Sequence, residues 1–97
     1  MLKSIKEIID YFDDNFESYN YNDCYVGVTS DIKQRLFVDH NVSEQNGHFT
    51  YWKAPSSTMA REVEQYFLER GMDGASGGGD ESAIMVYAYV KTPQTNP

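Results

Sequence analysis

The stretch CYVGVTSDIKQRLFVDH, residues 24–40, changes its pattern halfway along. Its first six residues, CYVGVT, are rich in β-forming side chains, which is typical of a buried strand. Ser30 or Asp31 can then cap a helix, and Gln34 follows Asp31 by three residues, as in a capping box. The stretch therefore predicts a strand, a short polar loop and a helix. The helix residues expected to face a core are Ile32, Leu36 and Phe37.

The rest of the chain continues this alternation of helices and strands. Apolar residues spaced three or four apart predict one helix near the N-terminus and another that ends at Gly71. Serine and threonine at 56–58 supply N-cap candidates for the second of these helices. In chain order, the expected elements are a helix over 2–16, a strand over 24–29, a helix from 31, a strand over 48–53, a helix over 59–70 and a strand over 82–91.

This α-β-α-β-α-β order predicts a single α+β domain over 1–97, with a small three-stranded sheet flanked by helices. The N-terminal helix occupies 1–16 and the central elements occupy 24–70. A Gly-rich loop over 71–81 precedes the last strand, and a polar tail over 92–97 is expected to fray.

Composition restricts the classes of function. The chain carries 15 acidic and 8 basic residues, for a net charge of −7, which argues against tight non-specific binding to nucleic acid. Cys24 is the only cysteine, so the chain forms no internal disulfide and no Cys-based zinc site. No apolar run reaches the roughly 18 residues of a membrane span, and the N-terminus lacks the features of a signal peptide. We therefore expect a cytoplasmic protein without a membrane partner.

Several residues of the opening stretch match a family pattern as a set. They are Tyr25, Gly27, Thr29, Asp31, Arg35 and Leu36, and a later helix adds Glu64 followed by Gln65 and bulky apolar residues. This set resembles the GIY-YIG nuclease family over roughly residues 24–70. The resemblance implies a GIY-YIG-like fold and a divalent-metal-dependent endonuclease that hydrolyses phosphodiester bonds in DNA or RNA.

The resemblance also implies a role for each matching residue. Glu64 would bind Mg²⁺ or Mn²⁺, and Arg35 would hold the scissile phosphate, to which the geometry of a guanidinium is suited. Tyr25 would orient or activate the attacking water, and His40 would assist proton transfer. In the family, this His lies one residue closer to the strand Tyr than His40 does. On an α-helix one residue is about 100° of rotation, which predicts that His40 is turned away from the site.

One signature of the family is missing. The first signature strand, Gly-Ile-Tyr, supplies the family's proposed general base, but the corresponding positions 12–14 read FDD. A substitute phenol must come from elsewhere, and the last strand could supply it by filling the vacant place in the sheet. The candidate phenols are those of Tyr19, Tyr21, Tyr87 and Tyr89.

Each residue also has an ordinary structural interpretation. Tyr25 would be a core aromatic, Arg35 an ion-paired surface residue and Glu64 an exposed helix residue. On that interpretation the domain is catalytically degenerate and acts as a protein-interaction module, which binds a protein partner or forms a homo-oligomer. A strand over 83–90 at an exposed sheet edge would serve such binding.

Overall fold

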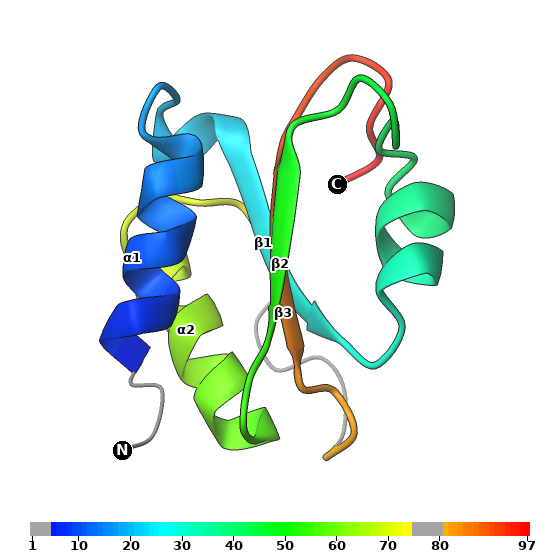
Figure 1. Ribbon diagram of the computed structural model, residues 1–97. Coiled ribbons are helices and arrows are strands. Elements are labelled where there is room, and N and C mark those ends of the chain that lie inside the picture. The colour runs from blue at the N-terminus through cyan, green and yellow to red at the C-terminus, as the bar shows by residue number, and fades with distance from the viewer. Residues whose placement is uncertain (1–4, 75–80) are drawn as a thin grey trace.

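The computed structural model describes residues 5–74 and 81–97, and it confirms the α+β class (Figure 1). The first four residues of the chain, and the central part of the Gly-rich loop, lie outside the described residues. The elements are α1 (Ile5–Phe16), a 3₁₀ turn η1 (Tyr21–Asp23), β1 (Cys24–Thr29), a π-helix η2 (Gln34–Asp39), β2 (Phe49–Lys53), α2 (Ser57–Glu69) and β3 (Met85–Val90). Helices α1 and α2 cover one face of the sheet and η2 covers the other (Figure 1).

The sheet is antiparallel and has the strand order β1-β3-β2. The last strand of the chain is therefore the central one, and the expectation that residues 83–90 lie at an exposed edge is wrong. The physical reason is visible in the composition of β3, MVYAYV, whose four inner residues are buried. A strand buried on both faces belongs inside a sheet, where its backbone groups find partners on both sides.

The outer edge of β1 is partly covered by the segment that follows α2. The amide of Val26 donates to the Asp73 carbonyl at 2.9 Å, and the amide of Asp73 donates to the Cys24 carbonyl at 2.9 Å. Residues 24–29 are buried throughout, because the side chains on the two faces of β1 enter the two cores described below. Cys24 lies fully inside, where burial raises the pKa of its thiol to about 11, so it is a core residue.

Alternation along the strands divides the core between the two faces of the sheet. The larger core lies under α1 and α2 and contains Ile8, Phe12, Phe16, Val26, Val63, Phe67 and Val86. The smaller one lies under η2 and contains Tyr25, Leu36, Val42, Tyr87 and Tyr89. The side chains predicted to face a core from η2 and its first turn do so, but they enter this second, Tyr-rich core.

The predicted helix after β1 forms with a wider turn than expected. The Asp31 carboxylate accepts from the Gln34 amide at 3.2 Å, which confirms the cap. The amide of His40 then donates to the Arg35 carbonyl at 2.9 Å, the i→i+5 hydrogen bond of a π-helix. The reciprocal half of the capping box is absent, because the Gln34 amide side chain donates to Asp39 instead.

The C-terminal tail is not the frayed end that its composition predicts. The amide of Asn96 donates to the His40 carbonyl at 2.7 Å, and the side-chain amide of Asn41 donates to the Gln94 carbonyl at 2.9 Å. Hydrogen bonds between Thr92 and Thr95 close the tail into a turn. The tail is therefore folded back on the segment that ends η2.

Removing residues 96 and 97 is expected to lower the free energy of unfolding by about 1–3 kcal/mol, because two hydrogen bonds to His40 are lost. Urea denaturation followed by circular dichroism measures the change. Removal of Pro97 alone is the matched control and should have little effect. Equal stability of the full-length chain and the shorter variant would show that the tail does not hold His40.

Candidate functional site

The register of the sheet brings three tyrosines together on the face covered by η2. Tyr25 of β1 is paired with Tyr89 of β3, and Gly27 is paired with Tyr87. The ring of Tyr25 stacks on those of Tyr89 and Tyr87 at centroid distances of 5.3 and 6.5 Å. Since β3 lies next to β1, the last strand supplies the phenols that the N-terminal part of the chain does not.

Gly27 makes room for the Tyr87 ring. A Cβ atom at position 27 would lie 2.5 Å from the Tyr87 hydroxyl oxygen and 2.7 Å from its ring carbon Cζ. These separations are far shorter than van der Waals contact, so the phenol lies directly over the Gly27 backbone. Gly27 thus fixes where the Tyr87 hydroxyl group lies.

His40 joins this cluster, contrary to the prediction that it is turned away. Its ring lies 4.6 Å from the Tyr25 ring, and its Nε2 atom lies 2.8 Å from the Tyr87 oxygen. The π-helix explains the difference, because its wide turn accommodates one more residue than an α-helical turn. The extra residue between Tyr25 and His40 is thereby absorbed, and the imidazole faces the sheet.

The partners of His40 define its tautomer. Its Nδ1 atom lies 2.7 Å from the carbonyl oxygen of Asn96, which can only accept, so Nδ1 carries the proton. Nε2 is then the acceptor, and the Tyr87 hydroxyl donates to it. The Tyr89 oxygen lies 3.1 Å from Nδ1 as a second, weaker partner. Hydrogen bonds thus connect the Tyr87 hydroxyl, the His40 imidazole and the backbone of the tail in one series.

Burial holds these groups in their neutral forms. It lowers the pKa of His40 below its ordinary value, with Asn96 acting in the opposite direction. It raises the pKa of Tyr25, Tyr87 and Tyr89, and Arg35 partly opposes the increase for Tyr25 and Tyr87. At neutral pH the imidazole is therefore an available proton acceptor beside an un-ionised phenol.

Arg35 connects the buried phenols with the surface. Burial lowers its pKa, but Tyr87, Asp39 and Tyr25 outweigh this effect and raise it above its ordinary value. Its guanidinium lies 3.3 Å from the Asp39 carboxylate, and its side chain is 45% exposed. Gln34 and Arg35 together lower the pKa of Asp39. An exposed pair of this kind is weak, so Arg35 can exchange Asp39 for an incoming anion.

A pocket of ≈ 370 Å³ adjoins Arg35. It lies at the end of β1, where the chain turns toward η2. Its walls are formed by Val28, Thr29, Ser30, Asp31, Gln34, Arg35 and Ala83. Among the described residues that line this pocket, Arg35 alone is cationic, and its position next to the tyrosine cluster suits recognition of one anionic group.

Glu64 is buried rather than exposed, so its interpretation as an exposed helix residue is wrong. Only 3% of its surface is accessible, and burial raises its pKa to about 7, with Arg61 acting in the opposite direction. No described residue donates a hydrogen bond to the Glu64 carboxylate. Every fully buried side-chain oxygen among the described residues has a hydrogen-bond partner, so the oxygens of Glu64 are not fully buried. Its oxygens therefore keep contact with solvent.

Glu64 also belongs to the surroundings of the tyrosine cluster. Its negative charge contributes to the raised pKa of both Tyr25 and Tyr87. Ser56 helps to place it, since its hydroxyl caps α2 by accepting from the Met59 amide at 3.1 Å. No group of three His, Cys, Asp or Glu side chains within 5–74 and 81–97 converges on a common point. Any cation at Glu64 would have one protein carboxylate and other, non-protein oxygen ligands.

The other two candidate phenols lie elsewhere. The Tyr21 hydroxyl donates to the Asp13 carboxylate of α1, and its ring packs on Phe67 in the larger core. The ring of Tyr19 packs on His48. The site therefore contains Tyr25, Arg35, His40, Tyr87 and Tyr89, with Glu64 nearby. Sequence reasoning missed the part played by the Asn96 carbonyl, because a backbone group leaves no signal in the residue pattern.

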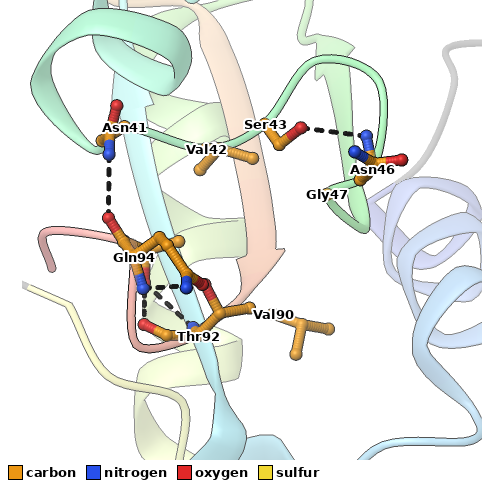
Figure 2. A pocket seen from close by; sticks show the side chains of 9 residues that line it. Asn41, Val42, Ser43, Asn46, Gly47, Val90, Thr92 and Gln94 are labelled. Atoms are coloured by element: carbon orange, nitrogen blue, oxygen red, sulfur yellow. Dashed lines mark hydrogen bonds between the residues drawn. The ribbon is translucent and has the colours of Figure 1, made fainter.

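A second cavity, of ≈ 300 Å³, lies between the 41–47 loop and the tail (Figure 2). Its walls are neutral: Asn41, Val42, Ser43, Asn46, Gly47, Val90, Thr92, Gln94 and Thr95. Several of these polar groups already bond to each other, as the dashed lines in Figure 2 show. None of the described residues that line it is charged, so this cavity does not offer the anion recognition that the Arg35 pocket offers.

Comparison of the chain with protein-family models, curated proteins and solved structures finds no match. The described residues include no helix with both the length and the apolar character needed to cross a membrane.

Proposed function

We propose that this protein is a GIY-YIG-like nuclease that hydrolyses phosphodiester bonds in nucleic acid. One observation carries the proposal. The last strand pairs with β1 so that the Tyr87 hydroxyl lies over Gly27 and donates to His40, while Arg35 stands next to it. Phosphodiester cleavage needs an anion-binding group and a route for protons at the same place, and this arrangement supplies both.

The residues have distinct parts in the proposed reaction. Arg35 binds the phosphate from the pocket side and stabilises the negative charge that grows on its oxygens. His40 Nε2 accepts the Tyr87 proton as the Tyr87 oxygen takes a proton from the attacking water, so that the pair acts as the base. The Asn96 carbonyl holds the resulting imidazolium in place through Nδ1.

Glu64 is the residue that would hold Mg²⁺ or Mn²⁺. A solvent-touching carboxylate without a hydrogen-bond donor is a suitable ligand for a hard cation, and one carboxylate with water and phosphate oxygens is a common set for Mg²⁺. When bound, such an ion would add Lewis-acid stabilisation of the phosphate charge. Deprotonation of Glu64 is a condition for this role, and its raised pKa makes that condition depend on pH near neutrality.

A second candidate is the catalytically degenerate domain that acts as a protein-interaction module. The burial of the phenols favours it, because Tyr87 is only 1% exposed and Tyr89 is fully buried. In that case the Tyr–His cluster is a polar core network, and Arg35 is a surface residue. The edge strand suggested for such a role is no longer a candidate, because β3 is central.

The deciding experiment measures cleavage of end-labelled single-stranded DNA, duplex DNA and RNA with Mg²⁺, with Mn²⁺ and with EDTA. Arg35→Ala is expected to reduce the rate at least a hundredfold, which is the size typical of losing one group that stabilises transition-state charge. Lys6→Ala is the matched control, because Lys6 is an exposed cation on α1, across the sheet from the pocket.

Metal-dependent cleavage that needs Arg35 but not Lys6 supports the nuclease. Cleavage that is the same in the wild type and in Arg35→Ala would come from a contaminant and would contradict the proposed site. Absence of cleavage on all three substrates would favour the degenerate domain.

A further inference from the structure

The sheet face that carries the tyrosine cluster continues past it onto β2. Tyr51 is paired with Tyr87, and Lys53 is paired with Met85. Paired residues of antiparallel strands point to the same face, so Tyr51 and Lys53 share the face of Tyr87. Met85 is also paired with Thr29, which lines the Arg35 pocket. One row of the sheet therefore runs from the pocket to Lys53.

The dimensions of a sheet set the length of this row. Neighbouring strands lie about 4.8 Å apart, so the backbone of Lys53 lies about 10 Å from that of Thr29. Tyr51 lies two residues before Lys53 on the same strand, about 7 Å along it. One small area of the surface is thus bordered by the Arg35 pocket, the Tyr51 ring and the Lys53 ammonium.

Tyr51 and Lys53 are available for contact. Tyr51 is 46% exposed, although tyrosine is a costly side chain to leave in water. Neither side chain has a hydrogen bond, ring contact or ion pair with any described residue; only their backbones are paired, within the sheet. The other exposed tyrosines differ in this respect, since Tyr11 packs on Trp52 and Tyr19 packs on His48.

An exposed aromatic ring beside one cationic group, and across the sheet from a second, is complementary to a strand of nucleic acid. A base can stack on the ring, and the flanking phosphates can lie against the cations. Two carboxylates lie near Arg35: that of Asp31 lines the pocket, and that of Asp39 pairs with the guanidinium. Lys53 at the opposite end of the row therefore matters for holding an anionic chain on a protein whose net charge is −7.

We propose that Tyr51 and Lys53 form the binding surface for a single-stranded segment of nucleic acid that flanks the phosphate at Arg35. The inference rests on the proposed function, since it takes Arg35 as the phosphate site. Tyr51 stacks on an unpaired base, and Lys53 contacts a backbone phosphate. Bases in a duplex are already stacked on each other, so this surface selects unpaired strands.

The test measures binding of a fluorescein-labelled oligothymidine by anisotropy in EDTA, where cleavage cannot interfere. Tyr51→Ala is expected to weaken binding about ten- to a hundredfold, as for the loss of one base–aromatic stack, while Tyr51→Phe keeps the affinity. Lys53→Gln is expected to reduce the slope of log affinity against log salt by about 0.7. Tyr19→Ala and Lys6→Ala are the matched controls and should bind like the wild type.

Equal affinity of Tyr51→Ala and the wild type would overturn the inference, as would an equal loss in Tyr19→Ala. A loss in Tyr51→Ala that is as large for duplex DNA as for the single strand would also overturn it. Binding that depends on Tyr51 in a protein without any metal-dependent cleavage would support this surface and reject the nuclease. Cleavage that needs Arg35 but is unchanged in Tyr51→Ala would support the nuclease and reject this binding surface.

Discussion

Replacing Glu64 with glutamine is expected to abolish metal-dependent cleavage and at the same time to stabilise the metal-free protein. Glutamine keeps the size of the side chain but removes the charge that a divalent cation would need. It also removes the cost of ionising a buried carboxyl group, whose pKa burial raises to about 7. At pH 8 the free energy of unfolding should therefore increase by about 3 kcal/mol.

The size of this stabilisation depends on pH. The Glu64 carboxyl group ionises near pH 4.5 in an unfolded chain and near pH 7 in the folded protein. Between these values the folded state binds more protons, so the stability of the wild type falls as pH rises through this window. The difference in free energy of unfolding between Glu64→Gln and the wild type should consequently be small at pH 4 and reach its largest value above pH 7.

Thermal unfolding across this pH range, with and without Mg²⁺ or Mn²⁺, measures both effects. Glu62→Gln is the matched control, because Glu62 lies on the same helix and is exposed. The two cations should raise the melting temperature of the wild type and of Glu62→Gln, but not that of Glu64→Gln. A melting temperature that rises equally with metal in all three proteins would rule out Glu64 as the ligand.

The second large effect is expected at Gly27. In Gly27→Ala the new methyl group would lie 2.5 Å from the Tyr87 oxygen, which is closer than the atoms can pack. Tyr87 is buried, so it can move only by disturbing its neighbours, and overpacking of this kind typically costs about 1–3 kcal/mol. The displaced hydroxyl would also lose its hydrogen bond to His40, so cleavage should fall together with stability.

A double-mutant cycle separates the clash from a general loss of stability. Tyr87→Leu removes the ring atoms nearest to the position of the new methyl group. Gly27→Ala should therefore cost much less in the Tyr87→Leu background than in the wild type, as measured by urea denaturation of the four proteins. Strictly additive losses would mean that Gly27 does not position Tyr87.

Much of the fold could be predicted from local patterns. The strand over 24–29, the Asp31 cap and the helix capped near Ser56 are confirmed, because short-range periodicity and capping residues determine them. The order of strands could not be predicted in the same way. The pairing of β3 with both β1 and β2 depends on contacts between residues far apart in sequence. The apolar composition of a strand does not indicate which strands lie beside it.

The candidate site was predictable in its composition rather than its geometry. Tyr25, Arg35 and His40 come from the opening stretch, but the π-helix that turns His40 inward has no residue signature that distinguishes it from an α-helix. Glu64 was singled out by the family resemblance, from Gln65 and the bulky apolar residues that follow it, whereas its burial depends on how α2 packs against β1. The role of the tail could not be predicted, because it acts on His40 through the Asn96 backbone.

The central place of β3 has a consequence for how this chain acquires its structure. Strands β1 and β2 do not pair with each other, and each finds its neighbouring strand only in residues 85–90, although β1 also exchanges two hydrogen bonds with Asp73. During synthesis, neither strand has its partner in the sheet until β3 is made. Closing such long loops is slow. The sheet therefore cannot form before β3 is present, and we expect the protein to fold late.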